Sequence, residues 1–318
     1  MAETTLLVGP LDRVLYFRTL PEMDRLSAAH LAAIAAHARE EFFPRGSTLI
    51  ASDEQVDTLF LVVDGQVALS RSGQAEGEAG PGASVGLLHL LARTERGLEA
   101  IAVTDTLTLR LDWDDHLDVC EEHFPIVEQY LWHLSDRMVE QLQAGPGLLH
   151  RPLSPPVLDL PEGRDLDIVE RLLTLHATGV FPTRAPDALG ELARHLEEVR
   201  FAPGTPVWHR GDPADDFLVV VDGEISCSAG ARHTPILVGP AGVVGMHEAL
   251  GYNDRWCDAV ATTASTALRV DVEALLDILE DHFDMAIDFV ALRAAETLRF
   301  GQVLAVDTGD ARNDADTP

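Results

Sequence analysis

One pattern constrains the fold of this chain more than any other, because the sequence repeats itself at an almost constant offset. The segment FLVVDGQV, residues 60–67, reappears as LVVVDGEI, residues 218–225. Gly46 lies upstream of the first segment as Gly204 lies upstream of the second, and the offset is 158 residues in both cases. Matches at a fixed offset indicate copies of one structural unit. We therefore expect two homologous domains, each long enough for its own core.

A second motif is repeated at an offset of 159 residues. The first copy begins at Gly86 and ends at Arg96, and the second begins at Gly245 and ends at Arg255; we call these segments the first and second cassette. Each predicts a tight turn, a short helix and then a buried strand. Backbone N–H groups at a helix start, with a guanidinium across from them, can hold a phosphate group.

The charge balance limits the class of partner. The chain has 53 acidic and 23 basic residues, for a net charge of −30. No basic excess is available to displace counterions, which argues against binding to nucleic acid or to an anionic membrane. Three cysteines, Cys120, Cys227 and Cys257, form no disulfide framework and suit a reducing compartment. No apolar stretch is long enough to span a bilayer, so we expect a cytoplasmic protein.

Apolar periodicity predicts an α+β fold with two repeated eight-stranded β-rolls, each flanked by N- and C-terminal helices. The expected order is helices over 11–40, short strands over 42–112, a helix over 112–143, helices over 166–199, strands over 203–270 and helices over 272–304. Within the first roll, Asp64-Gly65 predicts a hairpin whose return strand is Gln66–Ser70. The glycine-rich residues 73–82 predict a polar loop.

The domain boundaries follow from composition. Residues 1–144 and 163–305 are expected to form the two domains. Residues 145–162 contain several prolines and predict a linker. Residues 306–318 are acidic and small, which predicts a disordered tail.

Neither a metal centre nor a catalytic site is predicted. The chain has no His-x-His pair of the kind that a two-domain cupin would use to bind its metal. Residues 82–86 spell the G-x-S-x-G of a hydrolase nucleophile elbow, but that motif needs an α/β sheet and a long helix after the serine. The second copy has Val243 where the first has Ser84, so we interpret this match as chance.

The order of helices, roll, glycine–helix–arginine cassette and returning helices resembles the cyclic-nucleotide-binding domain family, here in tandem. The resemblance rests on GSTLI, LFLVVDGQVAL and VGLLHLLARTERGLEAIAV in the first copy, and on GTPVW, DDFLVVVDGEIS and VGMHEALGYNDRWCDAVA in the second. It implies that Gly86 and Gly245 open phosphate-binding turns and that Arg96 and Arg255 pair with the phosphate. It also implies a glutamate directly after each glycine, which binds the ribose 2′-hydroxyl.

The expected glutamates are missing. Leu87 and Met246 occupy their positions, and losing a charge-assisted bond to a sugar hydroxyl costs on the order of 1.5–3 kcal/mol. Glu248 could substitute if the short helix were shifted, although we favour a capping or solvated side chain. Trp256 could stack on a base, but packing is the commoner role of such an aromatic. An acid beside each arginine, such as Asp254, could neutralise the arginine instead of a phosphate.

The leading hypothesis is a non-enzymatic cytoplasmic regulatory protein that senses a cyclic nucleotide, cAMP or cGMP. The alternative is a ligand-independent protein-interaction scaffold that has lost the nucleotide. The sequence leaves both open, because the arginines are present and the glutamates are absent. A protein partner is expected in either case, and a homodimer is one option. A DNA-binding regulator is disfavoured, since no recognition helix is evident and the net charge is −30.

Overall fold

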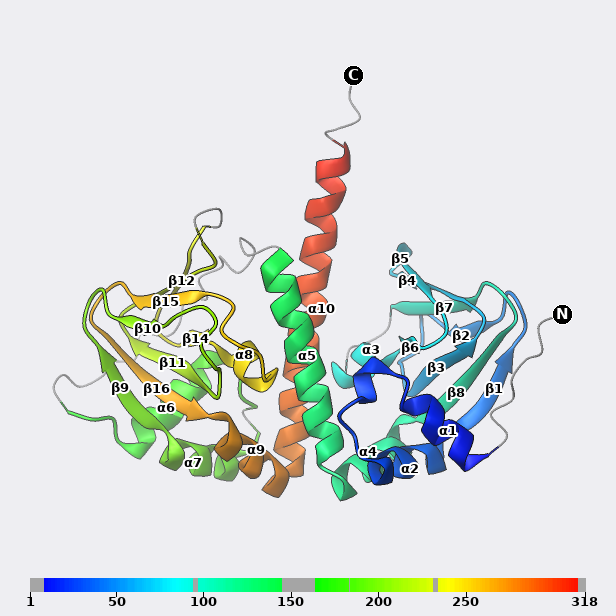
Figure 1. Ribbon diagram of the computed structural model, residues 1–318, viewed down its shortest axis with the longest axis horizontal. Coiled ribbons are helices and arrows are strands. Elements are labelled where there is room, and N and C mark those ends of the chain that lie inside the picture. Colours follow the sequence, from blue (N-terminus) through cyan, green and yellow to red (C-terminus); the bar gives the residue numbers. More distant parts are fainter. Residues whose placement is uncertain (1–8, 94–96, 145–163, 183, 231–233, 314–318) are drawn as a thin grey trace. The chain divides into compact units, whose positions relative to one another are not determined.

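The computed structural model describes residues 9–93, 97–144, 164–182, 184–230 and 234–313, with side-chain positions for all of them except Pro21 and residues 301–313. The chain divides into two compact units, Met1–Tyr130 and Leu131–Pro318. Each unit contains one roll (Figure 1). Among the described residues, no helix is both long and apolar enough to cross a membrane.

The first unit places helices on both sequence sides of eight described strands. Its helices are α1 (Pro10–Phe17), η1 (Pro21–Met23), α2 (Ala28–His37), α3 (Leu87–Leu91), α4 (Trp113–Glu122) and the first turns of α5 (Pro125–Ala144). Its strands are β1 (Arg39–Phe43), β2 (Thr48–Ile50), β3 (Thr58–Asp64), β4 (Val67–Arg71), β5 (Gln74–Ala79), β6 (Ser84–Val85), β7 (Leu98–Ala102) and β8 (Thr106–Asp112).

These strands form two antiparallel four-stranded sheets, in the orders β1-β8-β3-β6 and β2-β7-β4-β5. The predicted roll is therefore confirmed. The hairpin predicted at Asp64-Gly65 is wrong, because β3 pairs with β6 and β8 whereas β4 pairs with β5 and β7. The chain changes sheets at Gly65, where a Cβ would lie 2.5 Å from the Asp105 carbonyl oxygen. The predicted loop 73–82 contains strand β5, whose polar residues pair along the sheet edge.

Local signals explain the helices before the first roll. Ser27 caps α2 by accepting a hydrogen bond from the His30 backbone N–H. Leu31, Ile34 and Ala35 form the buried face of that helix, as their spacing predicts. The helix ends at His37 and β1 begins two residues later, so the strands start earlier than the predicted residue 42.

The second unit repeats the order of elements, again with eight described strands. Its helices are the rest of α5, α6 (Ile168–Thr178), α7 (Pro186–His195), α8 (Met246–Leu250), α9 (Val272–Asp281) and α10 (Phe283–Asn313). Its strands are β9 (Glu197–Phe201), β10 (Pro206–Trp208), β11 (Asp216–Asp222), β12 (Ile225–Ser228), β13 (Ile236–Val238), β14 (Val243–Val244), β15 (Asp258–Ala261) and β16 (Ser265–Asp271).

The second roll has the same topology as the first. Its sheets have the orders β9-β16-β11-β14 and β10-β15-β12-β13, which match the first two sheets strand for strand. One face of β11 packs inside the roll, where Leu218 and Val220 join an apolar cluster. The opposite face meets the segment after α6, because the rings of Phe217 and Phe181 stack with their centroids 6.4 Å apart, and Phe181 in turn stacks on Phe289 of α10.

Two boundaries differ from the composition-based ones. The compact units separate between Tyr130 and Leu131, inside α5, whereas the proline-rich segment begins at residue 145. In addition, α10 is helical to Asn313, and so extends into the segment 306–318 for which composition predicts disorder. A helix that is already nucleated adds one hydrogen bond per residue, so it continues through residues of modest intrinsic propensity.

Candidate functional site

The second cassette begins with a glycine that the geometry requires. Gly245 has φ 84° and lies directly before α8, and Gly251 is the C-cap residue that follows this helix. A Cβ at Gly245 would collide with the Arg255 guanidinium and would lie 3.0 Å from the Trp208 ring. The positive φ and the close approach both exclude other residues. The predicted turn and short helix are therefore present.

Arg255 is buried, with 3% of its surface exposed, and its charge is already paired. Its Nη2 donates to the Asp216 carboxylate at 2.6 Å and to the Asp216 carbonyl oxygen at 2.8 Å. Its Nη1 donates to the Gly245 carbonyl oxygen at 3.2 Å. Charge-assisted bonds of this length are the strong class of hydrogen bond. The guanidinium is thus held by the protein itself.

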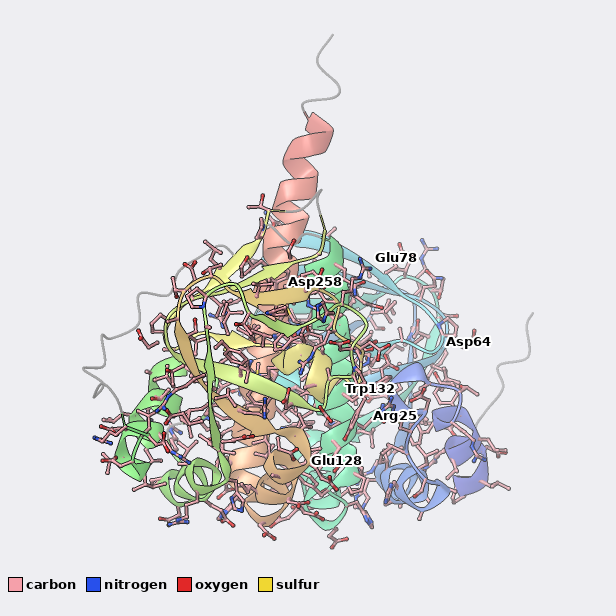
Figure 2. The ribbon with its side chains drawn as sticks, turned by 60° about the vertical axis from the view of Figure 1, so that its left-hand side comes forward. Arg25, Asp64, Glu78, Glu128, Trp132 and Asp258 are labelled. Carbon is pink, nitrogen blue, oxygen red and sulfur yellow. The ribbon has the colours of Figure 1, made fainter. Side chains whose placement is uncertain are left out.

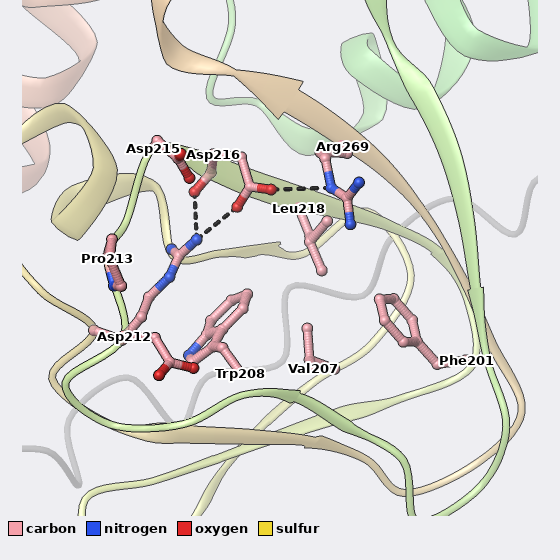
Figure 3. A pocket seen from close by; sticks show the side chains of 10 residues that line it. Phe201, Val207, Trp208, Asp212, Pro213, Asp215, Asp216, Leu218 and Arg269 are labelled. Atoms are coloured by element: carbon pink, nitrogen blue, oxygen red, sulfur yellow. Dashed lines mark hydrogen bonds and ion pairs between the residues drawn. The ribbon is translucent and has the colours of Figure 1, made fainter.

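Two further side chains complete this arrangement (Figure 3). The Trp208 ring lies against the guanidinium, 4.0 Å from its centroid to the Arg255 Cζ. The second oxygen of Asp216 pairs with Arg269 Nε at 2.9 Å, so that Asp216 bridges two arginines. We call Trp208, Asp216, Arg255 and Arg269 the arginine lock. Asp254, the acid expected from the sequence to neutralise Arg255, is exposed, and Asp216 takes that role.

A small cavity adjoins the arginine lock. Its volume is about 190 Å³, below the roughly 300–1,000 Å³ of typical ligand pockets. Its walls mix carboxylates, guanidiniums and apolar side chains from β9, β10, β11, β16 and the segments beside them. The lining residues are Phe201, Val207, Trp208, Asp212, Pro213, Asp215, Asp216, Leu218, Arg255 and Arg269. Three aspartates face two arginines here, and this balance does not attract an anion.

The residues at and near the expected glutamate position are buried. Met246 lies in the core, and Arg293 of α10 approaches its sulfur at 3.8 Å. Glu248 is 3% exposed, so the solvated role favoured from the sequence is wrong, whereas its side chain does hydrogen-bond its own backbone N–H in the first turn of α8. Burial raises the pKa of Glu248, while its own backbone N–H and the charge of Arg255 lower it. An ionised carboxylate at this position is therefore costly.

Trp256 belongs to the interior of the second roll. It packs in a cluster that we call the inner cluster, whose members come from the roll and from α5 and α10. The buried members are Met138, Val139, Leu142, Trp208, Leu218, Val220, Ile225, Cys227, Ile236, Val244, Trp256, Cys257, Ala259, Ala267 and Phe300. Trp256 is 9% exposed, so a stacked base would require this packing to open.

The first cassette begins in the same way but is lined differently. Gly86 has φ 97° and precedes α3, and a Cβ there would lie 3.0 Å from the Thr58 carbonyl oxygen. Leu87, at the expected glutamate position, is buried, as are Leu90 and Leu91. Arg96 lies outside the described residues. The first cassette is thus packed with leucine side chains.

His89 occupies the position in α3 that Glu248 occupies in α8. It is buried, and burial together with the positive charge of Arg71 lowers its pKa to about 4. A neutral imidazole therefore takes the place of the buried carboxylic acid at neutral pH.

Of the residues predicted from the sequence, the structure brings Gly245, Glu248 and Arg255 together at α8, whereas Trp256 lies in the inner cluster, Gly86 belongs to the first cassette and Arg96 is outside the described residues. Trp208, Asp216 and Arg269 were not predicted from the sequence. A signal was available in the repeat, since the offset of 158 residues aligns Asp216 with Thr58 and Trp208 with Ile50. No group of three or more potential ligands among the described residues could hold a metal ion.

Comparison with known proteins shows the family to which this chain belongs. The sequence model named "Cyclic nucleotide-binding domain" matches residues 40–123 and again residues 198–282, which together are more than half of the chain. A curated protein of Mycobacterium tuberculosis, a CRP-like cAMP-activated global transcriptional regulator, is 23% identical over 135 residues. That match covers 41% of this chain and 60% of the relative, so the chain spans less than two thirds of the curated protein.

Solved structures similar to this chain include regulatory subunits of cAMP-independent protein kinase A. The one from Trypanosoma cruzi, bound to guanosine, is 16% identical, with a TM-score of 0.36 and coverage of 94% of this chain and 92% of that one. A triple mutant of the one from Trypanosoma brucei, bound to cAMP, is also 16% identical, with a TM-score of 0.35 and coverage of 86% and 89%. A catabolite activator protein of Thermus thermophilus is 21% identical, with a TM-score of 0.31 and coverage of 39% and 72%.

Proposed function

We propose, from the premise that this chain belongs to the cyclic nucleotide-binding domain family, that it is a non-catalytic regulatory protein whose cassettes act without bound nucleotide. One observation carries the proposal: Arg255 is buried and its charge is paired with Asp216 of β11. In this proposal both rolls serve as interaction modules, and a protein is the binding partner. The curated relatives that it matches are themselves regulators.

The energetics of replacing the Asp216 carboxylate with a phosphate at Arg255 support this interpretation. A phosphate would compete with the Asp216 carboxylate for Arg255 Nη2, so at that nitrogen one charge-assisted pair would replace another with little net gain. Asp216 would then face an added anion in a protein of net charge −30. Met246 offers no acceptor for a ribose hydroxyl that would offset this loss.

The same charge indicates the chemistry of the partner. An acidic surface accelerates association with a basic one, and it suppresses binding to other acidic surfaces. We therefore expect a protein partner with a basic contact surface. Three free cysteines among the described residues, all buried, are compatible with the cytoplasmic location proposed here.

A calorimetric titration with cAMP, cGMP and a cyclic dinucleotide tests the proposal. We expect no binding heat from the wild type at millimolar nucleotide, because the Asp216 carboxylate competes with a phosphate for the Arg255 guanidinium. Trp208→Ala removes the aromatic ring that lies against the Arg255 guanidinium, so weak nucleotide binding is easiest to detect in this variant. Saturable binding by the wild type, abolished by Arg255→Ala, would contradict the proposal.

Nucleotide sensing is the second candidate function, and one observation favours it. The second cassette keeps the positive-φ glycine, the short helix and the arginine beside Gly245. If nucleotide binds there, Arg255→Ala weakens the affinity by on the order of 2 kcal/mol, about thirtyfold. Arg96→Ala then changes it little, since the first cassette is packed with leucines. Equal losses from both variants would assign binding to both cassettes.

A further inference from the structure

Two of the three cysteines lie beside each other inside the second roll. Cys227 belongs to β12, and Cys257 directly precedes Asp258, the first residue of β15, which is labelled in Figure 2. The antiparallel register pairs Cys227 with Ala259, which is two residues after Cys257. Ala259 is buried in the inner cluster, and so are both cysteines. Cys227 and Cys257 are therefore diagonal neighbours on the side of the sheet that faces the inner cluster.

The two thiols are in contact within the second unit. The Cys227 thiol hydrogen-bonds to the Cys257 side chain, and this bond, together with burial, raises the pKa of Cys227 well above its ordinary value. The charge of Glu248 raises the same pKa further, whereas the charge of Arg255 lowers it. The exposed fractions of Cys227 and Cys257 are 7% and 2%. The pair is thus buried within electrostatic reach of the second cassette.

The first roll shows that packing does not require sulfur at these positions. The repeat aligns Cys227 with Leu69 and Cys257 with Leu98. The register agrees, because Leu69 pairs with Ala100, which is two residues after Leu98. The first roll therefore has two leucines on the same diagonal. Two neighbouring thiols can form a covalent bond that two leucines cannot.

We propose that Cys227 and Cys257 are a modification site of the second roll, at which hydrogen peroxide converts the dithiol into a reversible disulfide. The dithiol is the resting form in the reducing compartment proposed above, where thiol–disulfide exchange with cellular thiols restores it. This inference goes beyond the proposed function, because it involves neither a nucleotide nor a protein partner.

The oxidation has two steps, and each releases one water molecule. The Cys257 sulfur attacks one peroxide oxygen, the O–O bond breaks, and the thiol proton leaves with the other oxygen as water. The Cys227 sulfur then attacks the sulfenic sulfur of Cys257, so that the S–S bond forms, the S–O bond breaks and the Cys227 proton leaves in the second water. Two thiols are oxidised to one disulfide, and the peroxide is reduced to water. Cys227 acts second, because its raised pKa limits the amount of thiolate.

The disulfide ties β12 to the end of the second cassette. Hydrogen bonds already hold the residues on both sides of Cys257, since the Arg210 backbone N–H donates to the Asp258 carboxylate at 2.9 Å and the Arg255 backbone N–H donates to the Asp212 carbonyl oxygen at 2.8 Å. A disulfide needs Cβ atoms about 3.5–4.5 Å apart, which is closer than diagonal neighbours usually lie. Its formation therefore draws Cys257 toward β12 and restrains the segment that carries Arg255.

Peptide mapping of the full chain tests the proposal. The folded protein is treated with hydrogen peroxide, its remaining thiols are alkylated in denaturant, and the digest is analysed by mass spectrometry without reductant. We expect a cross-linked peptide pair that contains Cys227 and Cys257 and is lost on reduction with dithiothreitol. Cys120 is the internal control, because it is buried and is the only cysteine in the sequence of the first unit, so it should remain a thiol.

Two results of the mapping would overturn the site. One is the persistence of both thiols under peroxide while near-UV circular dichroism shows that the protein is folded. The other is the accumulation of sulfinic acid at Cys227 or Cys257 without the cross-linked pair, since a nearby thiol should intercept the sulfenic acid first.

Hydrogen exchange of residues 246–258 measures the consequence of the cross-link. Oxidation should slow exchange about tenfold or more in the wild type, because a disulfide disfavours open and unfolded states. Cys120→Ala is the matched control and should respond as the wild type does, whereas Cys227→Ala should not respond. If Cys227→Ala does not fold, the reduced and oxidised wild type still give the comparison. Equal slowing in Cys227→Ala and the wild type would contradict the proposal. These readouts involve no nucleotide, so their failure leaves the proposed function untouched.

Discussion

The two cassettes have the same backbone conformation, but different side-chain interactions fill them. Both begin with a positive-φ glycine and a five-residue helix. In the first, Leu87, Leu90 and Leu91 are buried, so apolar packing closes the part of it that the structure describes. In the second, a buried arginine is paired with Asp216 and stacked on Trp208. The difference teaches that this fold keeps its cassette geometry without relying on one set of side chains.

The polar closure is the more fragile of the two. Thr58 matches Asp216 by position, and its hydroxyl only hydrogen-bonds to the neighbouring Asp57 carboxylate at 2.8 Å. Asp216 instead compensates the buried charge of Arg255. Removing one partner of a buried ion pair leaves an unpaired charge in the core, which is more costly than losing a neutral hydrogen bond.

The largest expected effect is therefore that of Asp216→Ala, which should lower the free energy of unfolding of the second domain by about 3–5 kcal/mol. The matched variant Thr58→Ala should cost the first domain about 1 kcal/mol. Chemical denaturation followed by domain-resolved hydrogen exchange measures both. The double variant Asp216→Ala/Arg255→Met should recover most of the loss, because it removes the unpaired charge. Similar small losses from both single variants would show that the arginine lock is not structural.

The sequence predicts the fold well because its signals are local and occur twice. The repeat, the apolar strands and the cassette glycines give two rolls with helices on both sequence sides. The hairpin at Asp64-Gly65 was wrong because the turn signal is local, whereas the sheet to which β4 belongs is decided by pairing with the distant strand β7. Short-range turn chemistry does not encode such a choice of sheet.

The candidate site was predicted only in part, for a related reason. Arg255 and Gly245 lie within one short segment, and their spacing is visible in the sequence. Asp216 is 39 residues from Arg255 in the chain, and its contact arises only when β11 and the second cassette meet in the roll. The burial of Glu248 likewise depends on packing around α8, which no periodicity over five residues reveals.

A smaller difference between the two domains is expected in how their unfolding free energies respond to acid. Burial lowers the pKa of His89 and His116 in the first unit, and of His247 in the second, to about 4 in each case. A lowered histidine pKa gives stability that is complete above pH 6.5 and is lost as the pH falls toward 4. Each histidine can contribute up to about 3 kcal/mol of this loss.

The first domain, with two such histidines among its described residues, should therefore lose stability faster than the second between pH 6.5 and pH 4. The raised pKa of Glu248 widens the gap, because its costly charge is removed as the pH falls. Unfolding free energies at half-unit pH steps, resolved by domain, give the comparison. His116→Asn should reduce the pH dependence of the unfolding free energy in the first domain only. Parallel profiles for the two domains would contradict the assignment of these histidines.

The smallest expected effect concerns Glu248 itself. Burial raises the pKa of Glu248 in the folded protein. The contribution of such a carboxyl group to stability is complete below its pKa in the unfolded state, and it is lost as the pH rises through its pKa in the folded state. At pH 7 the ionised side chain therefore opposes folding, although Arg255 reduces this cost. Glu248→Gln keeps the shape and removes the charge, so it should stabilise the second domain at pH 7 by up to about 1 kcal/mol. At pH 4 the gain should disappear, because the wild-type carboxyl is then protonated. A loss of stability at pH 7 would mean instead that Glu248 shares the compensation of Arg255 with Asp216, and that the second cassette depends on two carboxylates.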